Sequence, residues 1–239
     1  MIEVRRLAKR FGPVEALRDV SFRTTKGTIT AMLGENGAGK TTTLRIVLGF
    51  LRPDSGAVAI SPGRVGYVPD RPSYFPWLDG WTILELVRDG LGGRAGGRAG
   101  GNGRDFRPMV LAAARDLLFD PGLLRHRPGS YSAGNVRKFA YLQNLVAGPD
   151  LLVVDEPYAS LDPPSIKAVR DVFCGLREAG KTVLLSSHML AEMERIADGF
   201  VVLRRGATIA HAGLREWRLM RSARTAPDLE TVFLRLTGP

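Results

Sequence analysis

A glycine-rich segment at residues 34–41, GENGAGKT, carries the clearest chemical signal in this 239-residue sequence. It fits the pattern G-x-x-x-x-G-K-[ST] and lies between a strand-like run and a helix-like run. Its glycines let the backbone curl so that N–H groups face a phosphate, Lys40 can reach the β- and γ-phosphates, and Thr41 offers a hydroxyl to Mg²⁺. The alternative, an ordinary glycine-rich turn, would match this pattern by chance in about one chain in a hundred of this size.

Two carboxylates follow an apolar run at residues 151–154. In parallel α/β sheets, ligands bind at the edge where the strands have their carboxyl ends. Asp155 at this edge can hold Mg²⁺ through its hydration shell, and Glu156 can act as a general base that polarises a water molecule against the γ-phosphate. Acidic pairs are also common in turns, but this pair accompanies a phosphate-binding segment. The pair therefore predicts a metal ligand and a general base.

The order and spacing of these motifs resemble the ATP-binding subunit of an ABC transporter over nearly the whole chain. Three further motifs carry the resemblance: Tyr131-Ser132-Ala133-Gly134-Asn135, Ser160-Leu161-Asp162, and His188 after a strand-like run. The resemblance implies that ATP and Mg²⁺ bind to the chain. The nucleotide contacts that it implies near the glycine-rich segment are Gly34, Asn36, Gly37, Ala38, Gly39, Lys40, Thr41 and Thr42.

The resemblance also implies a second ATPase subunit as a partner, either a copy of this chain or a related one. In the family, the short Ser-containing motif opens a helix and acts across a dimer, so Ser132 and Gly134 would hold the γ-phosphate bound to the other subunit. A Ser hydroxyl and free N–H groups at a helix start form an anion site. The segment YSAGN departs from the family's usual Leu-Ser-Gly-Gly-Gln but retains the Ser and the second Gly.

Two single residues gain a role only from the resemblance. On its own, Phe11 would more often be a core residue, and His188 would be a solvated or hydrogen-bonded histidine. Their positions match the family's aromatic residue that stacks on adenine and its switch histidine that contacts the γ-phosphate. The resemblance therefore implies nucleotide binding by Phe11 and a catalytic role for His188.

Asp70 departs from the family pattern, because the family usually has Gln after the strand that corresponds to residues 64–68. Gln offers a neutral amide to Mg²⁺ and the attacking water, whereas Asp offers only oxygen and a negative charge. Asp70 can still ligate magnesium, so we expect it to join Thr41 and Asp155 at the metal and to take part in catalysis. Asp at this place resembles an export-associated branch, as does the tail at 228–236 with its apolar helical stripe. The alternative is that the tail merely packs on the domain.

Hydrophobic periodicity predicts the elements that must position these residues. Period-two and apolar runs predict a strand-rich start, and from Lys40 the apolar spacing is helical until a turn at 53–56. Helical segments dominate between residues 82 and 146, and strands alternate with helices after Leu151. We expect an α/β fold of the P-loop NTPase type, with a mixed or parallel sheet core, an N-terminal antiparallel β part and a helical subdomain.

The chain is expected to be a single ATPase domain with two parts. Residues 1–69 and 150–239 would form the catalytic α/β core, and residues 70–149 the helical subdomain. Residues 92–103 in the subdomain are rich in Gly and Arg and predict a flexible loop, because they cannot bury apolar surface. A nucleic-acid role is the alternative for this segment, but it lacks the aromatic residues of a stacking platform.

Composition excludes several classes of protein. The single cysteine, Cys174, rules out an internal disulfide and a thiolate cluster. The formal net charge is +10, but the Arg residues are scattered, so the charge does not favour a nucleic-acid partner. The longest apolar run is far shorter than the roughly 20 residues that span a bilayer, and the first residues do not resemble a signal peptide. We therefore expect a cytoplasmic chain.

Residues 71–81 concentrate large apolar side chains between prolines, immediately after Asp70. Exposed aromatic clusters are typical of binding hot spots, so this segment is expected to dock a permease helix. The alternative is that its rings cap the interface between the two subdomains. The large apolar residues are Tyr74, Phe75, Pro76, Trp77, Leu78 and Trp81.

These observations predict an ATP-hydrolysing subunit that dimerises around two ATP molecules and drives a separate membrane permease for export. It would lie on the inner face of the cell membrane through that permease. The alternative is a soluble ABC-type ATPase acting on nucleic acid or ribosomes, but the chain has no second ATPase unit and no long basic arm. A P-loop GTPase or kinase fits less well. The sequence has no Asn-Lys-x-Asp motif for guanine, and the Ser132-x-Gly134 element would have no function in such a protein.

Overall fold

The computed structural model describes residues 1–61, 63–90, 106–212 and 233. The chain divides into two compact units, which we describe separately: unit 1 comprises residues 1–62, 153–156 and 176–239, and unit 2 comprises residues 63–152 and 157–175. The glycine-rich segment at 92–103 and all of the tail at 228–236 except Phe233 lie outside the described residues. The boundaries expected at residues 69 and 150 stay a prediction.

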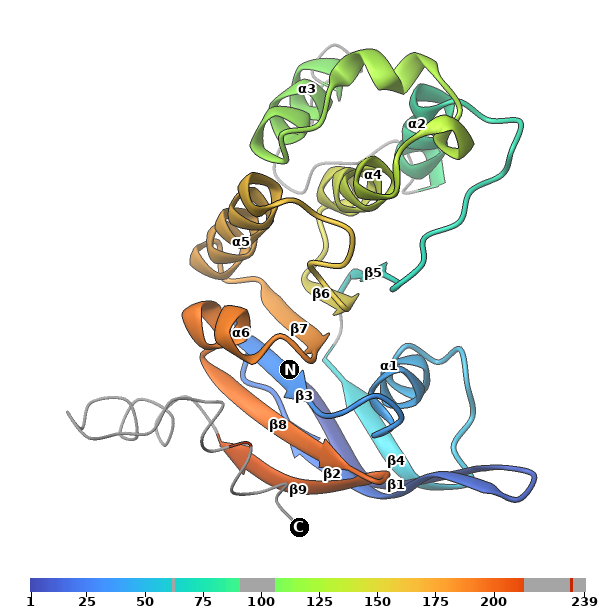
Figure 1. The fold of residues 1–239 in the computed structure, drawn as a ribbon, viewed down its shortest axis with the longest axis vertical. Helices are drawn as coiled ribbons and strands as arrows, with labels where there is room; N and C mark the ends of the chain where they lie inside the picture. Colours follow the sequence, from blue (N-terminus) through green and yellow to red (C-terminus); the bar gives the residue numbers. More distant parts are fainter. Residues whose placement is uncertain (62, 91–105, 213–232, 234–239) are drawn as a thin grey trace, which may run out of the picture. The chain divides into compact units, whose positions relative to one another are not determined.

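Unit 1 contains most of a mixed β-sheet, in which the strand order is β4-β1-β2-β9-β8-β3-β7-β6 (Figure 1). β1 pairs with β2 and β4 in antiparallel fashion, whereas β3 pairs with β7 and β8 in parallel. The strands are β1 (Ile2–Phe11), β2 (Val14–Arg23), β3 (Ile29–Leu33), β4 (Ser55–Ile60), β6 (Leu151–Asp155), β7 (Thr182–Ser187), β8 (Gly199–Arg204) and β9 (Ala207–Ala212). The expected fold class is confirmed, including its antiparallel N-terminal part.

The burial of each strand follows from its sequence pattern. β3 and β6 are apolar almost throughout, and β7 is apolar in its middle; all three are buried at every position, which is typical of parallel strands covered on both faces. β1 and β2 carry charged residues at many positions and are buried only in part. The sequence therefore buries these parallel strands, whose carboxyl ends lie beside the predicted site residues.

The described helices of unit 1 are α1 (Lys40–Val47) and α6 (Leu190–Ile196). α1 begins at Lys40 as predicted but ends at Val47, before the turn at 53–56, and Gly49 follows with a φ of 75°. A left-handed glycine shortly after the last helical residue is a common helix stop. β8 and β9 are joined by a tight turn in which Arg205 and Gly206 have φ values of 47° and 76°.

Unit 2 is mainly helical, and α4 contacts α2, α3 and β5. An aromatic core surrounds α4: the ring of Phe139 lies 5.8 Å from that of Tyr131, and the ring of Tyr141 lies 5.7 Å from that of Phe173. Its elements are β5 (Val65–Val68), α2 (Gly80–Gly90), α3 (Phe106–Asp116), the 3₁₀ turns η1 (Pro121–Arg125) and η2 (Pro128–Ser130), α4 (Ala133–Ala147) and most of α5 (Pro163–Glu178). Among the described residues, no helix has the length and apolarity needed to span a bilayer.

Candidate active site

The glycine-rich segment connects β3 to α1, and its backbone conformation requires glycine. Gly39, immediately before α1, has a φ of 103°, and a Cβ there would lie 2.5 Å from Leu17 Cδ2. The Ala38 carbonyl accepts a hydrogen bond of 3.1 Å from the Gly206 N–H, in the turn between β8 and β9. The segment is thus held against two neighbouring parts of unit 1, which fixes the direction in which its N–H groups and the start of α1 face.

Lys40 is the first residue of α1, and its side chain is only 7% exposed. Its Nζ donates hydrogen bonds to the carbonyls of Gly34, at 2.7 Å, and Glu35, at 3.2 Å, and lies 3.8 Å from Glu156 Oε1. Burial lowers the pKa of the Lys40 ammonium below its usual range, while the nearby carboxylates of Glu156 and Asp155 act in the opposite direction. The segment therefore encloses a cation that phosphate oxygens can reach.

Asp155, at the end of β6, is only 1% exposed, and hydroxyl groups contact both of its carboxylate oxygens. Thr41 Oγ1 donates to Oδ2 at 2.7 Å, and Ser186 Oγ, from β7, donates to Oδ1. A hydroxyl beside a carboxylate is a set of hard oxygen donors that suits Mg²⁺, which usually takes one or two protein ligands together with phosphate oxygens and water. Within the described parts of the chain, no cluster of three or more His, Cys, Asp or Glu residues could form a metal site by itself.

Glu156 and His188 form a hydrogen-bonded pair beside Asp155. His188 Nδ1 lies 2.9 Å from Glu156 Oε2, and the two side chains are 60% and 18% exposed, respectively. Glu156 has a φ of 50°, which is uncommon for a residue with a side chain, and its N–H donates to the Ser186 carbonyl at 2.9 Å. The backbone thus turns sharply after β6 and directs the Glu156 carboxylate toward both His188 and Lys40.

Two further predicted contacts in unit 1, Phe11 and Asn36, lie at its surface. Phe11, at the end of β1, is 48% exposed, and Lys9 Nζ lies 5.7 Å from the centroid of its ring. Lys9 is paired with Asp54 at 2.7 Å, so its ammonium is fixed near the ring. Asn36 is exposed in the glycine-rich segment, and Thr42 is partly buried in α1. An exposed ring of this kind has a face available for stacking.

Ser132 and Gly134 lie in unit 2, at the start of α4. Ser132 is the N-cap residue, and its hydroxyl accepts a hydrogen bond of 3.3 Å from the Asn135 N–H. A Cβ at Gly134 would lie 2.8 Å from the Ser160 carbonyl oxygen, so only glycine permits this close approach of the backbone. Tyr131, just before the helix, is buried and donates its hydroxyl to the carbonyls of Leu123 and His126.

Asp70 also lies in unit 2, and the guanidinium of Arg137 contacts it. Arg137 Nη2 donates to the Asp70 carbonyl and lies 3.4 Å from the Asp70 carboxylate oxygen Oδ1. The structure therefore brings together one group of predicted site residues in unit 1 and describes the others separately in unit 2. The group in unit 1 is Lys40, Thr41, Asp155, Glu156 and His188.

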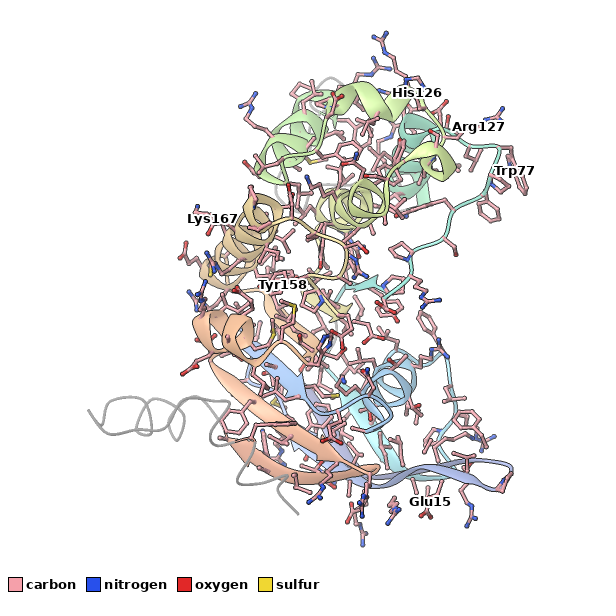
Figure 2. The ribbon with its side chains drawn as sticks, viewed as in Figure 1. Glu15, Trp77, His126, Arg127, Tyr158 and Lys167 are labelled. Carbon is pink, nitrogen blue, oxygen red and sulfur yellow. The ribbon has the colours of Figure 1, made fainter. Side chains whose placement is uncertain are left out.

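The segment at 71–81 differs from the single exposed cluster that the sequence suggested. Phe75 and Trp77 are 62% and 66% exposed, and Figure 2 shows Trp77 at the outside of this segment. Tyr74 instead packs edge-on against Phe139 of α4, with ring centroids 5.1 Å apart, and the Trp81 ring stacks 4.9 Å from the Arg107 guanidinium. Two of the rings therefore belong to the packing of unit 2.

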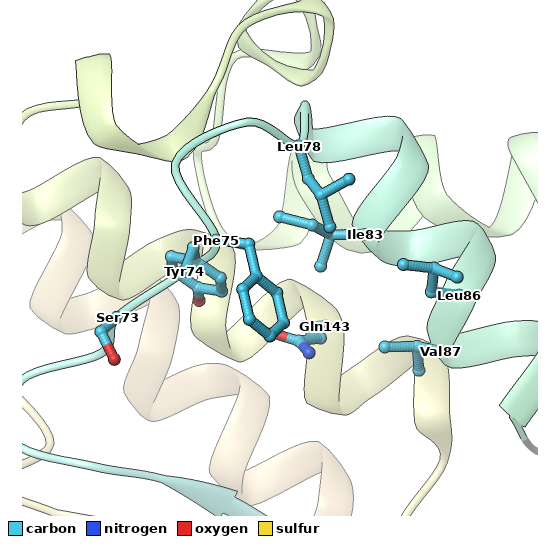
Figure 3. A pocket seen from close by; sticks show the side chains of 8 residues that line it. All are labelled: Ser73, Tyr74, Phe75, Leu78, Ile83, Leu86, Val87 and Gln143. Atoms are coloured by element: carbon cyan, nitrogen blue, oxygen red, sulfur yellow. The ribbon is translucent and has the colours of Figure 1, made fainter.

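A pocket of about 500 Å³ lies beside the exposed rings (Figure 3). Apolar side chains from α2 and from the segment before it form most of its wall, and Gln143 of α4 contributes an amide. The lining residues are Ser73, Tyr74, Phe75, Leu78, Ile83, Leu86, Val87 and Gln143. An apolar groove with exposed aromatic residues at its rim is suited to an apolar helix from a partner.

Sequence reasoning missed three residues that hold the predicted ones in place: Ser186, Arg137 and Gly206. Ser186 was visible only as a polar residue near the end of an apolar strand, immediately before Ser187 and His188. Nothing local distinguishes Arg137 from the other Arg residues of the chain, because its partner Asp70 is far away in the sequence.

Comparison with known proteins gives a consistent family match. The family model described as "ABC transporter" matches residues 17–159. An uncharacterized ABC transporter ATP-binding protein of Methanocaldococcus jannaschii is 30% identical, and the match covers 90% of this chain and 78% of that protein. The Nod factor export ATP-binding protein I of Burkholderia lata is 32% identical, over 87% of this chain and 69% of its own. A Synechocystis ABC transporter ATP-binding protein is 31% identical, and the chain spans only 58% of its length.

Solved structures give the same result for the fold. The structure of an ATP-binding subunit of an ABC transporter superimposes with a TM-score of 0.85 at 27% identity, covering 99% of both chains. A dimeric ATP-binding cassette in a post-hydrolysis state, bound to ADP and Pi, superimposes with a TM-score of 0.77 at 22% identity, over 90% of this chain and 99% of that one.

Proposed function

The chain belongs to the ABC transporter family as an ATP-binding and ATP-hydrolysing subunit, and we propose that it drives a separate membrane permease in the direction of export. The observation that carries the proposal is the grouping of Lys40, Thr41, Asp155, Glu156 and His188 in unit 1. These side chains supply a cation, hard oxygen ligands and a general base at the start of α1 and at the ends of β6 and β7.

For nucleotide binding, we propose that phosphate oxygens of ATP replace the Gly34 and Glu35 carbonyls as partners of the Lys40 ammonium. The start of α1 and the N–H groups of the glycine-rich segment would surround the same phosphates. The Phe11 ring, exposed at the end of β1, would stack on the adenine. The site would thus bind the nucleotide from both its phosphate end and its base.

For magnesium, the donor set fits, and we propose Thr41 and Asp155 as its protein contacts. Mg²⁺, when bound, would neutralise charge on the phosphate oxygens. Ser186 holds the other oxygen of Asp155 and so fixes the direction of the carboxylate. Asp70, proposed from the sequence as a further contact, lies in unit 2 and is held by Arg137.

For hydrolysis, we propose Glu156 as the general base. Its carboxylate can accept a proton from a water molecule that attacks the γ-phosphate. His188, which shares a hydrogen bond with Glu156, would orient that carboxylate and contact the γ-phosphate through its other ring nitrogen. Lys40 would stabilise the negative charge on the transferring group, and Thr41 and Asp155 would hold the magnesium that helps to neutralise it.

For assembly, we propose that two such subunits enclose two ATP molecules. Ser132, with its hydroxyl at the start of α4, would contact the nucleotide bound to Lys40 of the partner subunit. The related cassette whose structure contains ADP and Pi is dimeric, which supports this arrangement. ATP would then hold the dimer closed, and hydrolysis would allow it to open.

For transport, we propose that the pocket beside Phe75 and Trp77 receives an apolar helix of the permease. Export is favoured because relatives include Nod factor export proteins. The chain would then lie at the inner face of the membrane through its permease. The relatives give no support to the alternative of a nucleic-acid or ribosome ATPase.

The substitution Glu156→Gln tests this function. It should retain ATP binding and lower turnover by a factor of about 10² or more, because a general base typically contributes 10²- to 10⁴-fold. Without hydrolysis, ATP should remain bound and an ATP-bound dimer should accumulate. Phosphate release in the steady state measures the first effect, and size-exclusion chromatography with ATP measures the second.

The matched control is Glu178→Gln, which removes an exposed carboxylate at the end of α5. It should hydrolyse ATP at the wild-type rate. Wild-type phosphate release by Glu156→Gln, after removal of contaminating ATPases, would refute the assignment of the base.

A further inference from the structure

Arg137 is a buried cation outside the group of site residues in unit 1. It lies in the first half of α4, and its side chain is 3% exposed. A buried guanidinium requires partners for its charge and its N–H groups. Its Nη2 donates to the Asp70 carbonyl and lies 3.4 Å from the Asp70 carboxylate oxygen Oδ1, so residue 70 supplies both a neutral and a charged acceptor.

A second arginine near Asp70 has a very different environment. Arg71 Nε lies 3.9 Å from Asp70 Oδ2, but the Arg71 side chain is 96% exposed. Water screens such a pair, so it contributes little. The Asp70 side chain is 46% exposed, so one side of it faces solvent while Arg137 holds the other. Arg137 is therefore the partner that can fix the position of this carboxylate.

Helix α4 holds the strand before Asp70 at a second point. Asn144 Nδ2 donates to the Tyr67 carbonyl at 3.1 Å and to the Ala140 carbonyl at 2.8 Å. A Cβ at Gly66 would lie only 2.5 Å from Asn144 Oδ1, which shows how closely the helix and β5 approach. Two side chains of one helix thus fix the backbone from residue 67 to residue 70.

The same helix also holds the residue that follows the proposed base in the sequence. Tyr141, one turn after Arg137, donates its hydroxyl to the Pro157 carbonyl at 2.7 Å. Burial raises the pKa of Tyr141, and a hydrogen bond with Arg137 acts against that rise. Arg137 therefore contacts the segment that ends at Asp70, while its neighbour Tyr141 on the same helix contacts Pro157.

We propose that Arg137 is a positioning residue for Asp70: it neutralises the carboxylate and fixes residue 70 to α4, which allows Asp to stand where the family usually has a neutral Gln. A neutral side chain at this place needs no counter-ion, whereas an unneutralised carboxylate would repel the anionic nucleotide in the proposed cycle. Because Ser132 is the N-cap residue of α4, a shift of this helix with Asp70 would also move the Ser that is proposed to face the partner subunit. The part of the proposal that concerns hydrolysis rests on the proposed function, whereas the ion pair does not.

The test is a double-mutant cycle with Asp70→Gln, Arg137→Gln and the double variant in the full chain. Asp70→Gln leaves a buried guanidinium without its carboxylate and should lower the thermal midpoint by about 4 °C or more. Arg137→Gln leaves an unneutralised carboxylate and should raise the KM for ATP about tenfold. The double variant should recover at least half of each loss, because two neutral amides can hydrogen-bond without a counter-ion.

Arg71→Gln is the matched control, since it removes the exposed arginine near the same carboxylate. It should change the KM by less than about twofold and leave the thermal midpoint unchanged. Should Arg137→Gln fail to fold, Arg137→Lys keeps the charge but loses the planar fork, and its raised KM should fall again when Asp70→Gln is added.

Three results separate the possible outcomes. The positioning role would be overturned if the two substitutions had additive effects on both the thermal midpoint and the KM for ATP. It would also be overturned if the raised KM of Arg137→Gln did not fall when Asp70→Gln was added. Equal effects of Arg137→Gln and Arg71→Gln would overturn it as well. If the wild-type chain hydrolysed no ATP while the thermal midpoints still showed coupling, the proposed function would fail and the ion pair would stand.

Discussion

Asp155 shows how a buried carboxylate is supplied with hydrogen-bond donors. At 1% exposure it has almost no contact with water, and burial of an ionised carboxylate is costly unless hydrogen bonds compensate. Thr41 and Ser186 each donate a hydroxyl to one of its oxygens, and Lys40 brings a positive charge nearby. Thr41 would exchange this bond for magnesium in the proposed cycle, so Ser186 is the hydroxyl that can hold Asp155 throughout.

Ser186→Ala should therefore weaken both stability and nucleotide binding. Removing a hydrogen bond to a buried charged group costs about 2 kcal/mol in the free energy of unfolding. Because Asp155 would lose the contact that fixes one of its oxygens, the affinity for ATP with magnesium should fall more than the affinity for ATP without it. Chemical denaturation and nucleotide titration, with and without magnesium, measure the two effects.

Ser187→Ala is the control from the same strand. Ser187 is also fully buried, but its hydroxyl accepts a bond of 3.0 Å from the Met189 N–H and does not contact Asp155. It should lower stability by about 1 kcal/mol and leave the magnesium dependence unchanged. Equal magnesium dependence in both variants would show that Ser186 has no particular role at Asp155.

The contrast between Lys40 and Ser186 explains which site residues the sequence could predict. Short motifs contain Lys40, Thr41, Asp155 and Glu156, and local structure sets the spacing within each motif: the curled glycine-rich loop in one case and the end of a strand in the other. Ser186 and Arg137 act on partners that are distant in the chain, Asp155 and Asp70. Only the pairing of strands and the packing of α4 bring those partners together, and no local pattern encodes either.

At the scale of elements, the start of α4 depends on Tyr131. This residue stands where the family's motif usually has Leu, and its hydroxyl donates to the Leu123 and His126 carbonyls at 2.7 and 3.0 Å. Its ring packs on Phe139 of the helix. The tyrosine therefore fixes the polypeptide before Ser132 to the 3₁₀ turn η1, in a way that Leu could not reproduce because it has no donor.

Tyr131→Phe should lower the stability of the protein by about 1 kcal/mol at neutral pH, because the two carbonyls lose a buried donor. Burial, with a smaller effect from Asp79, raises the pKa of Tyr131 to about 12. A pKa raised in the folded state means that this residue's stabilising effect is complete below the unfolded value near 10 and is lost as the pH rises toward 12. The difference between wild type and Tyr131→Phe should therefore shrink over that pH range in urea unfolding.

Tyr141→Phe is the comparison variant for this prediction. Its hydroxyl donates to Pro157, so its loss should lower stability without affecting the start of α4. Amide hydrogen exchange at Asn135 should become faster in Tyr131→Phe and stay unchanged in Tyr141→Phe. Unchanged exchange in both variants would mean that Ser132 alone fixes the start of the helix.

Element boundaries show the same limit of sequence reasoning. The start of α1 follows from the glycine-rich segment, but its end at Val47 comes earlier than the apolar spacing indicates, because the left-handed Gly49 stops the helix. Strand β9 takes part in both kinds of pairing, because it pairs with β8 in antiparallel fashion and with β2 in parallel. Such pairing depends on which strands meet in space and has no signature in either strand.

At the scale of the whole transporter, Phe75 and Trp77 should be required for contact with the permease. The double substitution Phe75→Ser with Trp77→Ser should leave the chain folded and able to bind ATP, because both rings are more than 60% exposed. Co-purification with the permease should be lost. Tyr74 is left unchanged in this test, since its ring packs on Phe139 and its removal would disturb unit 2.

Phe50→Ser is the control for that experiment, because Phe50 is 67% exposed and lies in unit 1. It should co-purify with the permease as the wild type does. Normal recovery of the permease with the Phe75 and Trp77 double variant would place the docking surface elsewhere.

The proposed dimer leads to a complementation experiment, because Lys40 and Ser132 would act on the same nucleotide from different chains. A Lys40→Ala homodimer and a Ser132→Arg homodimer each have both sites damaged and should not turn over ATP. In a mixed dimer, one site collects both defects and the other keeps an intact Lys40 and an intact Ser132. With random exchange of subunits, about half of the dimers would be mixed, so mixing should restore about a quarter of the wild-type rate if the sites act independently.

Phosphate release after mixing, compared with each variant alone at the same total concentration, measures this recovery, and the recovered rate should fall on dilution. A tagged pull-down shows whether the dimers exchange subunits. If they do and phosphate release still does not recover, Ser132 and Lys40 of one chain would act at the same nucleotide, and the shared site would be overturned.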